Sequence, residues 1–356
     1  MNKIFQNWLK NIDLFSFLSF MILIIIGIIL SFSTQDNLAF IQRHLFYSFF
    51  SVILIIILSF LDVKRIRRVS LIGLVICILI MILILFNDFE INGAKRWLKF
   101  FGGFTIQPSE FVKPFFFVIS GWFLTKGIEG KNESLYFVFL SFLTLITLLI
   151  LQPDFGMTVL ISVTFFCQLF MAGLSIYLVA VVFILMILLF FLSYIFLGHV
   201  NLRIKSWIEH FINPDPYSQI SKSLNSFMSG GFLGKGPGQG NLKNQLPEAN
   251  TDFIFAVAGE EFGFIFCSII VSVFLIIIIR NLLKLLKIEK PYIIISIVGL
   301  ICSFGIQTLI NIFSSLSLIP AKGMTLPLIS YGGSSMLSTG ILIGFLLSFT
   351  NKKNYD

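Results

Sequence analysis

The stretch SVILIIILSFLDVKRIRRVSLIGLVICILIMILILF, residues 51–86, decides the fold class. It consists of two long apolar runs joined by a short segment that carries the basic cluster KRIRR at 64–68. A helix that crosses a bilayer needs about 20 predominantly apolar residues, and Lys and Arg favour loops on the cytoplasmic side. The stretch therefore predicts two membrane-spanning helices joined by a cytoplasmic loop.

The composition of the whole chain agrees with a membrane protein. Of its 356 residues, 57% are hydrophobic and only 12% are charged, which is about half of the charged fraction of a soluble domain. This excludes a soluble enzyme, a nucleic-acid-binding module and a secreted disulfide-rich domain. We predict an all-α polytopic membrane protein that forms one domain over residues 1–356. The ten predicted membrane-spanning helices are 14–33, 44–61, 70–87, 108–125, 135–151, 156–173, 175–197, 252–279, 291–313 and 332–350.

The distribution of Lys and Arg predicts the orientation. With the N-terminus in the cytoplasm, the predicted inner segments hold 14 basic residues and the predicted outer segments hold ten. We therefore expect both termini in the cytoplasm and the long segment 198–251, with GGFLGKGPGQG at 230–240, on the outer face. A loop of this length is more often functional than idle. Its basic residues indicate an anionic ligand or, alternatively, contact with anionic lipid headgroups.

Cysteine and histidine do not indicate a metal site. The four cysteines lie singly within apolar runs, and the three histidines are scattered along the chain. No spacing typical of metal ligands or of a disulfide framework links them. We therefore predict no protein-bound metal.

The motif QPSEFVKP at 107–114 opens one predicted span with a proline, which a helix tolerates in its first turn. Glu110 and Lys113 are three residues apart and lie on one face of that helix. Charged side chains at the edge of a membrane helix are costly unless they are paired or used. Two interpretations remain open: a structural ion pair that locks two helices, and contact of Lys113 with a phosphate-bearing ligand.

The motif LPEANTDFIFAVAGEEFG at 246–263 places Asp252 where the long outer segment meets the next span. There it is accessible to a polar substrate, or it caps the helix that follows. Glu260 and Glu261 lie roughly 12 to 14 Å deeper, where two carboxylates are too costly to be incidental. They are functional, protonated, or paired with Lys113. Gly259 and Gly263 form a GxxxG pattern that allows close packing of helices.

The motif IPAKGMTLPLISYGGSS at 319–335 interrupts the helical pattern repeatedly with Pro and Gly. Irregular backbone near a membrane must line a cavity or be buried in protein, so we expect a cavity wall or a structural re-entrant loop. Nearby, Trp97 is either a residue of the membrane interface or a platform for a sugar ring. The polar candidates of the motif are Lys322, Ser330, Ser334 and Ser335.

Five motifs in this order resemble the SEDS family (shape, elongation, division and sporulation): GAKRW, QPSEFVK, QPDFG, the block from GGFLGKGPGQG to LPEANTDFIFAVAGEEFG, and PAKGMTLPLISYGGSS. The resemblance covers nearly the whole chain. AVAGEEFG and IPAKGMTLP are more similar to the branch that acts in division than to the branch that acts in elongation. The chain departs from the family at Asn250, where His is usual, and in QPDFGM, which replaces the commoner QPDLGT.

The resemblance implies polymerisation of lipid II, an undecaprenyl-diphosphate-linked disaccharide-pentapeptide, into β-1,4 glycan on the outer face of the bacterial cytoplasmic membrane. It implies a role at the division septum, with a class B penicillin-binding protein and other division proteins as partners, alongside membrane lipid and no nucleic acid. The family's essential aspartate matches Asp252, and its polar cavity residues match Glu110 and Lys113. The further substrate-contacting candidates are Lys95, Arg96, Trp97, Arg203, Glu248, Thr251, Lys322, Ser330, Gly332, Gly333 and Ser334.

The implied chemistry suits a single carboxylate. The donor sugar leaves as a lipid diphosphate, so the reaction needs charge stabilisation more than a proton, unlike glycosidases with two carboxylates. Asp252 would act as general base on the acceptor hydroxyl, with inversion at the sugar. Lys113, the loop cations and backbone amides would stabilise the diphosphate, and a divalent cation such as Mg²⁺ or Mn²⁺ could assist. The rival functions are a lipid II flippase, with Glu260, Glu261, Glu110 and Lys113 along its path, and a division scaffold.

Overall fold

The structure is a computed structural model. It describes residues 3–34, 38–86, 95–99, 105–173, 198–213, 218–241, 248–320 and 323–354, together with single positions between 175 and 195 and at 215 and 246. Apolar helices dominate the described part, as a bilayer requires, because a helix satisfies all of its own backbone hydrogen bonds. The helices are α1 (Lys3–Asn11), α2 (Leu14–Thr34), α3 (Leu38–Ser59), α4 (Val63–Leu85), α5 (Pro108–Ile128), α6 (Asn132–Leu151), α7 (Phe155–Met171), α9 (Gly198–Ile212), α10 (Gln219–Gly230), α11 (Ile254–Leu285), α12 (Pro291–Ser315), α13 (Gly333–Phe349) and the short 3-10 turn Lys352–Asn354.

Nine of the ten predicted spans coincide with a described helix. Seven of these helices are long and apolar enough to cross a membrane, and α7 and α13 are shorter apolar helices. The predicted span 175–197 lies mostly outside the described residues. The basic cluster 64–68 was predicted in a loop, but it lies in the first turns of α4. The loop between α3 and α4 is short, and long basic side chains can reach water from a helix end.

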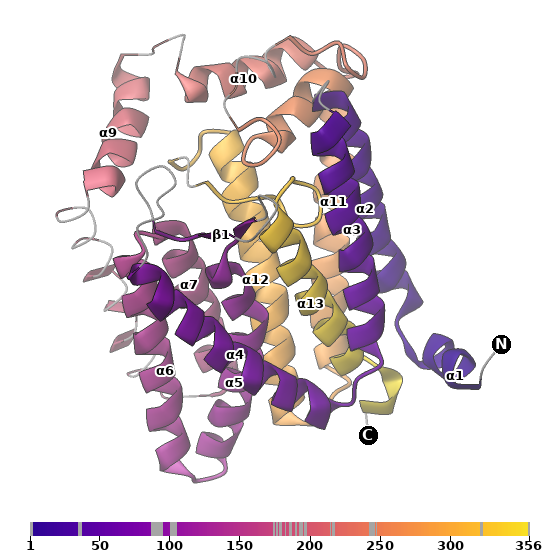
Figure 1. The fold of residues 1–356 in the computed structure, drawn as a ribbon, viewed down its shortest axis with the longest axis vertical. Helices are drawn as coiled ribbons and strands as arrows, with labels where there is room; N and C mark the ends of the chain where they lie inside the picture. The colour runs from indigo at the N-terminus through magenta and orange to yellow at the C-terminus, as the bar shows by residue number, and fades with distance from the viewer. Residues whose placement is uncertain are drawn as a thin grey trace.

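Helices α5 and α12 form the centre of the bundle (Figure 1). About 72% of the apolar window of α5 and 78% of that of α12 are buried, against at most 50% in the other spanning helices. Gln168 of α7 joins both: its Nε2 donates to the carbonyls of Phe117 at 2.8 Å and Ile295 at 3.0 Å, and its Oε1 accepts from Ser120 at 2.6 Å. A satisfied polar side chain of this kind fixes the register of three helices.

The segment 198–251 contains two helices, of which α10 lies across one end of the bundle and α9 stands to one side of that end (Figure 1). They are held to the segment where α12 ends: Trp207 Nε1 donates to the Ser317 carbonyl at 2.9 Å, and Ser223 Oγ donates to the Ser315 carbonyl at 2.6 Å. The predicted all-α fold is confirmed, and a short two-stranded antiparallel hairpin, β1 (Leu98–Lys99) and β2 (Thr105–Ile106), is added to it at the same end. The two termini lie at the opposite end (Figure 1).

Helix α11 is broken at Gly263, where φ is +78° and ψ is −176°. A side chain at φ +78° is strained in an L-residue, so only glycine adopts this conformation at little cost. The backbone groups freed by the break are taken up by the glycine-rich loop 230–241. Lys235 N and Gly236 N donate to the carbonyls of Glu260 and Glu261, at 3.0 and 2.9 Å. In return, the amides of Phe264 and Ile265 donate to carbonyls of the loop.

The side chains of Glu260 and Glu261 hold the same loop. Both are buried, with exposures of 0% and 1%. Glu260 Oε1 pairs with Lys235 Nζ at 2.9 Å and accepts from Asn241 N at 3.0 Å, and Glu261 Oε2 accepts from Gly238 N at 3.0 Å. Of the interpretations of this pair, the one with Lys113 as partner is therefore wrong, because Lys113 contacts Glu110 and Gln307 and Lys235 supplies the cation to Glu260.

The GxxxG pattern also serves this junction. A Cβ added to Gly259 would lie 2.3 Å from the ring of Phe227 on α10, and one added to Gly230 would lie 2.0 Å from the Gly259 carbonyl oxygen. Close helix packing is therefore confirmed, with α10 as the partner.

Candidate active site

A cavity of about 330 Å³ opens at the end of the bundle that carries α9, α10 and the hairpin. It is built from the motifs that the sequence singled out, although these lie far apart along the chain. Ten predicted residues line it: Arg96, Trp97, Glu110, Glu248, Thr251, Asp252, Gly332, Gly333, Ser334 and Ser335.

Asp252 lies at the boundary of two cavities. A second cavity, of about 270 Å³, is lined by Ser206, Ser218 and Gln219 from the α9–α10 region and shares Glu248, Asp252 and Gly323 with the first. Elements packed on both sides of the start of α11 create this arrangement. One carboxylate is therefore accessible from two separate spaces.

The backbone of Asp252 is fixed, whereas its side chain faces the cavities. Its carbonyl accepts from Asn311 Nδ2 at 2.9 Å, and its amide donates to the Glu248 carbonyl at 3.1 Å. The N-cap of α11 is Phe253, with no side-chain cap. Capping by Asp252, one of the two interpretations of this residue, is therefore wrong, because the helix begins one residue too late for it.

Glu110 and Lys113 form the predicted ion pair at the floor of the cavity. Lys113 Nζ lies 2.6 Å from Glu110 Oε2 and also 2.6 Å from Oε1 of Gln307 on α12. Glu110 lines the cavity, while Lys113 lies behind it with an exposure of 1%. The pair therefore connects α5 to α12, and direct contact of Lys113 with a ligand stays a prediction.

Arg96 and Asp154 form one corner of the cavity. Arg96 donates from Nε to the Gln152 carbonyl at 3.1 Å and from Nη2 to the Pro153 carbonyl, and its Nη1 lies 3.5 Å from Asp154 Oδ1. Asp154 caps α7 and accepts at Oδ2 from Gln107 and Ser109, each at 3.1 Å. The QPDFG motif therefore builds a rigid corner that positions a guanidinium group beside the cavity.

The segment 323–335 is irregular and lines the cavity, as predicted. Ser330 does not line it; its hydroxyl instead donates to the Thr251 carbonyl at 2.5 Å and accepts from Leu326 N at 2.8 Å. This bond ties the segment to the residue before Asp252. Gly323, with φ +64°, lies so close that an added Cβ would be 3.3 Å from Asp252 Oδ2.

Helix α13 begins at the cavity wall. Its N-cap is Gly332, and Gly332, Gly333, Ser334 and Ser335 all line the cavity. A Cβ on Gly333 would lie 2.5 Å from the ring of Tyr47 on α3, so a larger residue there would displace this ring. The first amides of a helix have no acceptor within it, and the helix dipole favours an anion there.

The remaining predicted residues lie elsewhere. Lys95 precedes β1 and is outside the cavity lining, Arg203 lies on α9 with a side chain that is not described, and Lys322 is outside the described residues. The sequence did not identify Gln107, Tyr47, Thr325 or Tyr331 as lining residues. Burial raises the pKa of Tyr331, despite the opposing effect of Arg43, so this phenol is neutral at physiological pH.

Metal-ligating side chains are not clustered in the part of the chain that the structure describes. No group of three or more His, Cys, Asp or Glu side chains is arranged there to hold one. Mg²⁺ is usually held by one or two carboxylates together with substrate phosphates, and such binding does not need a cluster of this kind.

Fold and cavity together define a class: a multi-pass helical membrane protein with a polar cavity at one membrane surface. The family described as "Cell cycle protein", which comprises FtsW, RodA and SpoVE, matches residues 6–355. The probable peptidoglycan glycosyltransferase FtsW of Caulobacter vibrioides is 38% identical over 277 residues, 77% of this chain and 70% of that protein. The protein of the same name from Borreliella burgdorferi is 36% identical over 276 residues, 75% and 74% of the two chains.

Two solved structures share the fold. A chain of a peptidoglycan synthase complex, described as coordinating polymerization and crosslinking, gives a TM-score of 0.77 at 23% identity, covering 95% of this chain and 97% of that chain. RodA of Thermus thermophilus gives a TM-score of 0.72 at 23% identity, covering 97% and 98%. This chain belongs to the FtsW/RodA/SpoVE family, which confirms the SEDS resemblance, and the FtsW names of its relatives agree with the predicted division branch.

Proposed function

We propose that this chain is a peptidoglycan glycosyltransferase that polymerises lipid II by inverting transfer, with Asp252 as general base. The enzyme class is that of its FtsW relatives. The observation that supports the catalytic assignment most directly is the shared position of Asp252 between two cavities. A polymerase must bind a donor and an acceptor at once, and a base between them reaches the acceptor hydroxyl as it attacks the donor sugar.

The other acidic side chains of the first cavity are less suited to this role. Glu110 is paired with Lys113 at 2.6 Å, and Asp154 is engaged by Arg96, Gln107 and Ser109. A carboxylate already engaged in this way is poorly placed to contact a substrate hydroxyl. Glu248 lines both cavities and is the remaining rival.

The departing diphosphate is stabilised by groups already positioned. Arg96 is fixed by two carbonyls, and the N-terminus of α13 directs its first amides at the same cavity. Such preorganised donors stabilise developing charge without reorganising during the reaction. A divalent cation, if one is needed, would arrive with the diphosphate.

The flippase alternative is less well supported. A crossing path would need exposed polar residues along the bundle, yet Glu260 and Glu261 are buried against the loop 230–241 and do not line the cavity. Glu110 and Lys113 are likewise engaged with each other and with Gln307. These groups stabilise packing instead of forming a route for a headgroup.

Orientation, location and partner belong to the same proposal. The cavity opens to the cell exterior, and both termini lie in the cytoplasm, at the opposite end of the bundle from α10 (Figure 1). The enzyme acts at the division septum with a class B penicillin-binding protein, consistent with the synthase complex that shares its fold. Adding such a transpeptidase to the purified enzyme should raise its polymerisation rate.

The decisive experiment is lipid II polymerisation by the purified chain carrying Asp252→Asn. Asn matches Asp in size but cannot accept a proton, and loss of a positioned base typically costs about 10²–10⁴-fold in rate. Glu248→Gln tests the rival base, and Glu209→Gln is the matched control, an exposed glutamate of α9 away from both cavities. A near-normal rate for Asp252→Asn, or a larger loss for Glu248→Gln, would overturn the assignment.

A further inference from the structure

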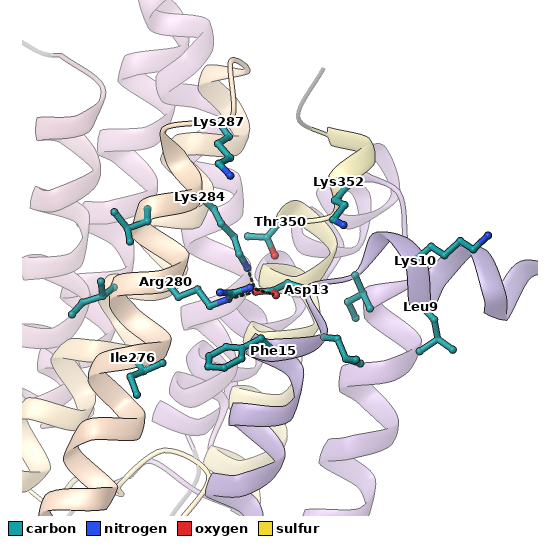
Figure 2. A pocket seen from close by; sticks show the side chains of 14 residues that line it. Leu9, Lys10, Asp13, Phe15, Ile276, Arg280, Lys284, Lys287, Thr350 and Lys352 are labelled. Atoms are coloured by element: carbon teal, nitrogen blue, oxygen red, sulfur yellow. Dashed lines mark hydrogen bonds and ion pairs between the residues drawn. The ribbon is translucent and has the colours of Figure 1, made fainter.

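The largest cavity among those described lies at the other end of the bundle, remote from Asp252. It measures about 810 Å³ and is bounded by the α1–α2 junction, the C-terminal half of α11 and the end of the chain (Figure 2). The proposed polymerase mechanism makes no use of it. Its basic lining residues are Lys10, Arg280, Lys284, Lys287 and Lys352.

Asp13 is the one acidic side chain in this lining, and it is already engaged. Arg280 donates to it twice, Nε to Oδ2 at 2.9 Å and Nη2 to Oδ1 at 2.8 Å, and Lys284 and Ser16 also contact Oδ2. Burial opposes ionisation of Asp13, but these hydrogen bonds outweigh it and hold its pKa well below the usual range. The lining therefore keeps an excess of four positive charges.

The positions of the lysines concentrate this charge. Lys287 and Lys352 come from different segments and both extend toward the space beside the Asp13 cluster, while Lys10 points away (Figure 2). Both lysines are exposed, whereas Lys284 is only 9% exposed. Helix C-termini attract basic residues, which accounts for Lys284 and Lys287 but not for the convergence of Lys352 on the same space.

The wall of the cavity below the charges is apolar and open to the surroundings. Leu14, Phe15, Ile276, Ile279 and Leu283 line it with exposures between 46% and 58%. On a membrane-spanning bundle, such side chains face acyl chains. The basic residues match the anionic headgroup of a lipid, and the exposed apolar wall beside them matches its acyl chains.

We propose that this cavity binds the phosphate of an anionic glycerophospholipid in the cytoplasmic leaflet, with an acyl chain along the wall formed by Phe15, Ile276 and Ile279. Basic pockets between membrane helices on the cytoplasmic side are suited to such headgroups. The lipid joins the α1–α2 junction, α11 and the C-terminal segment, whereas the Asp13 cluster links the α1–α2 junction to α11. Free phosphate shares the headgroup chemistry but leaves the apolar wall uncovered.

The test is lipid binding to the full chain by native mass spectrometry, titrated with phosphatidylglycerol and phosphatidylcholine. We expect one tightly held phosphatidylglycerol, bound in preference to phosphatidylcholine. Lys287→Gln with Lys352→Gln should weaken it roughly 30-fold, which corresponds to about 1 kcal/mol for each cation near the membrane surface. Arg68→Gln with Lys131→Gln is the matched control, because it removes two exposed cations outside the cavity, and it should leave binding within twofold.

Two further arms separate lipid from free phosphate. Ile279→Ser, a change in the apolar wall, should weaken phosphatidylglycerol binding, and inorganic phosphate at millimolar concentration should fail to displace the lipid. Equal binding by the double lysine variant, no preference over phosphatidylcholine, or displacement by inorganic phosphate would each overturn the proposal. Melting curves of all variants establish that a loss of binding is not a loss of fold.

Discussion

Lys113→Met is the most informative change in the bundle, because it separates the two interpretations of the motif QPSEFVKP. Lys113 is 1% exposed, and its ammonium lies 2.6 Å from both Glu110 Oε2 and Gln307 Oε1. Methionine keeps the length of the side chain but leaves a buried carboxylate without its cation. Removal of one partner of a buried pair costs about 3–5 kcal/mol. Divided by the unfolding entropy of a globular protein of this length, this loss of free energy corresponds to a drop in Tm of roughly 4–7 °C.

The assay is a double-mutant cycle read by thermal unfolding in detergent and by lipid II polymerisation. Glu110→Gln combined with Lys113→Met removes both charges, so it should recover most of the lost Tm. A Lys113→Met variant with unchanged Tm and no polymerisation would refute this reasoning and make Lys113 a substrate contact.

Three further outcomes are expected. Gln239 lies in the exposed part of the glycine-rich loop. In a variant without the native cysteines, Gln239→Cys should react with a membrane-impermeant thiol reagent in intact cells whose outer membrane is permeabilised. Labelling that occurs only after lysis would reverse the proposed orientation. Gly323→Ala should slow polymerisation about tenfold, because its Cβ would lie 3.3 Å from Asp252, whereas Gly130→Ala, also at positive φ but with no neighbour within 4 Å, should not. Asp13→Asn should lower Tm equally at pH 5 and pH 8. The pKa of Asp13 is lowered in the folded protein, so its charge stabilises the fold fully above the pKa of the unfolded state, about 3.9. This stabilisation is lost only in stronger acid. A smaller loss of Tm at pH 5 than at pH 8 would contradict the prediction for Asp13→Asn.

The sequence predicted the spans because a bilayer leaves few alternatives to a helix. An apolar run such as 14–33 has no other way to satisfy its backbone in lipid, and α2 spans Leu14–Thr34. The ends of the helices were less predictable. The basic cluster of α4 was predicted as a loop because its residues are charged, but from the first helical turns its long side chains still reach water.

The site was predictable where chemistry is local and not where partners are distant. Glu110 and Lys113 are three residues apart, so their pairing follows from helix geometry. Glu260 binds Lys235, 25 residues away across an irregular loop, and no periodicity in the sequence indicates that contact. The second cavity beside Asp252 was equally hidden, because residues of α9 and α10, more than 30 positions before Asp252 at their nearest lining residue Ile220, form one side of it.

The break in α11 also has a consequence for how deep the protein sits in the bilayer. From Gly263 to Arg280, which pairs with Asp13 at the opposite end, the helix rises about 26 Å at 1.5 Å per residue, close to the hydrocarbon thickness of about 30 Å. The break therefore lies near the headgroup level at the end of the bundle that carries the cavity of Asp252, and Glu260 and Glu261 lie beyond the hydrocarbon. Because the loop fixes the break by main-chain hydrogen bonds, the apolar length of α11 cannot adjust. Membranes of different thickness must then be accommodated by tilt of the whole bundle or by local deformation of the lipid.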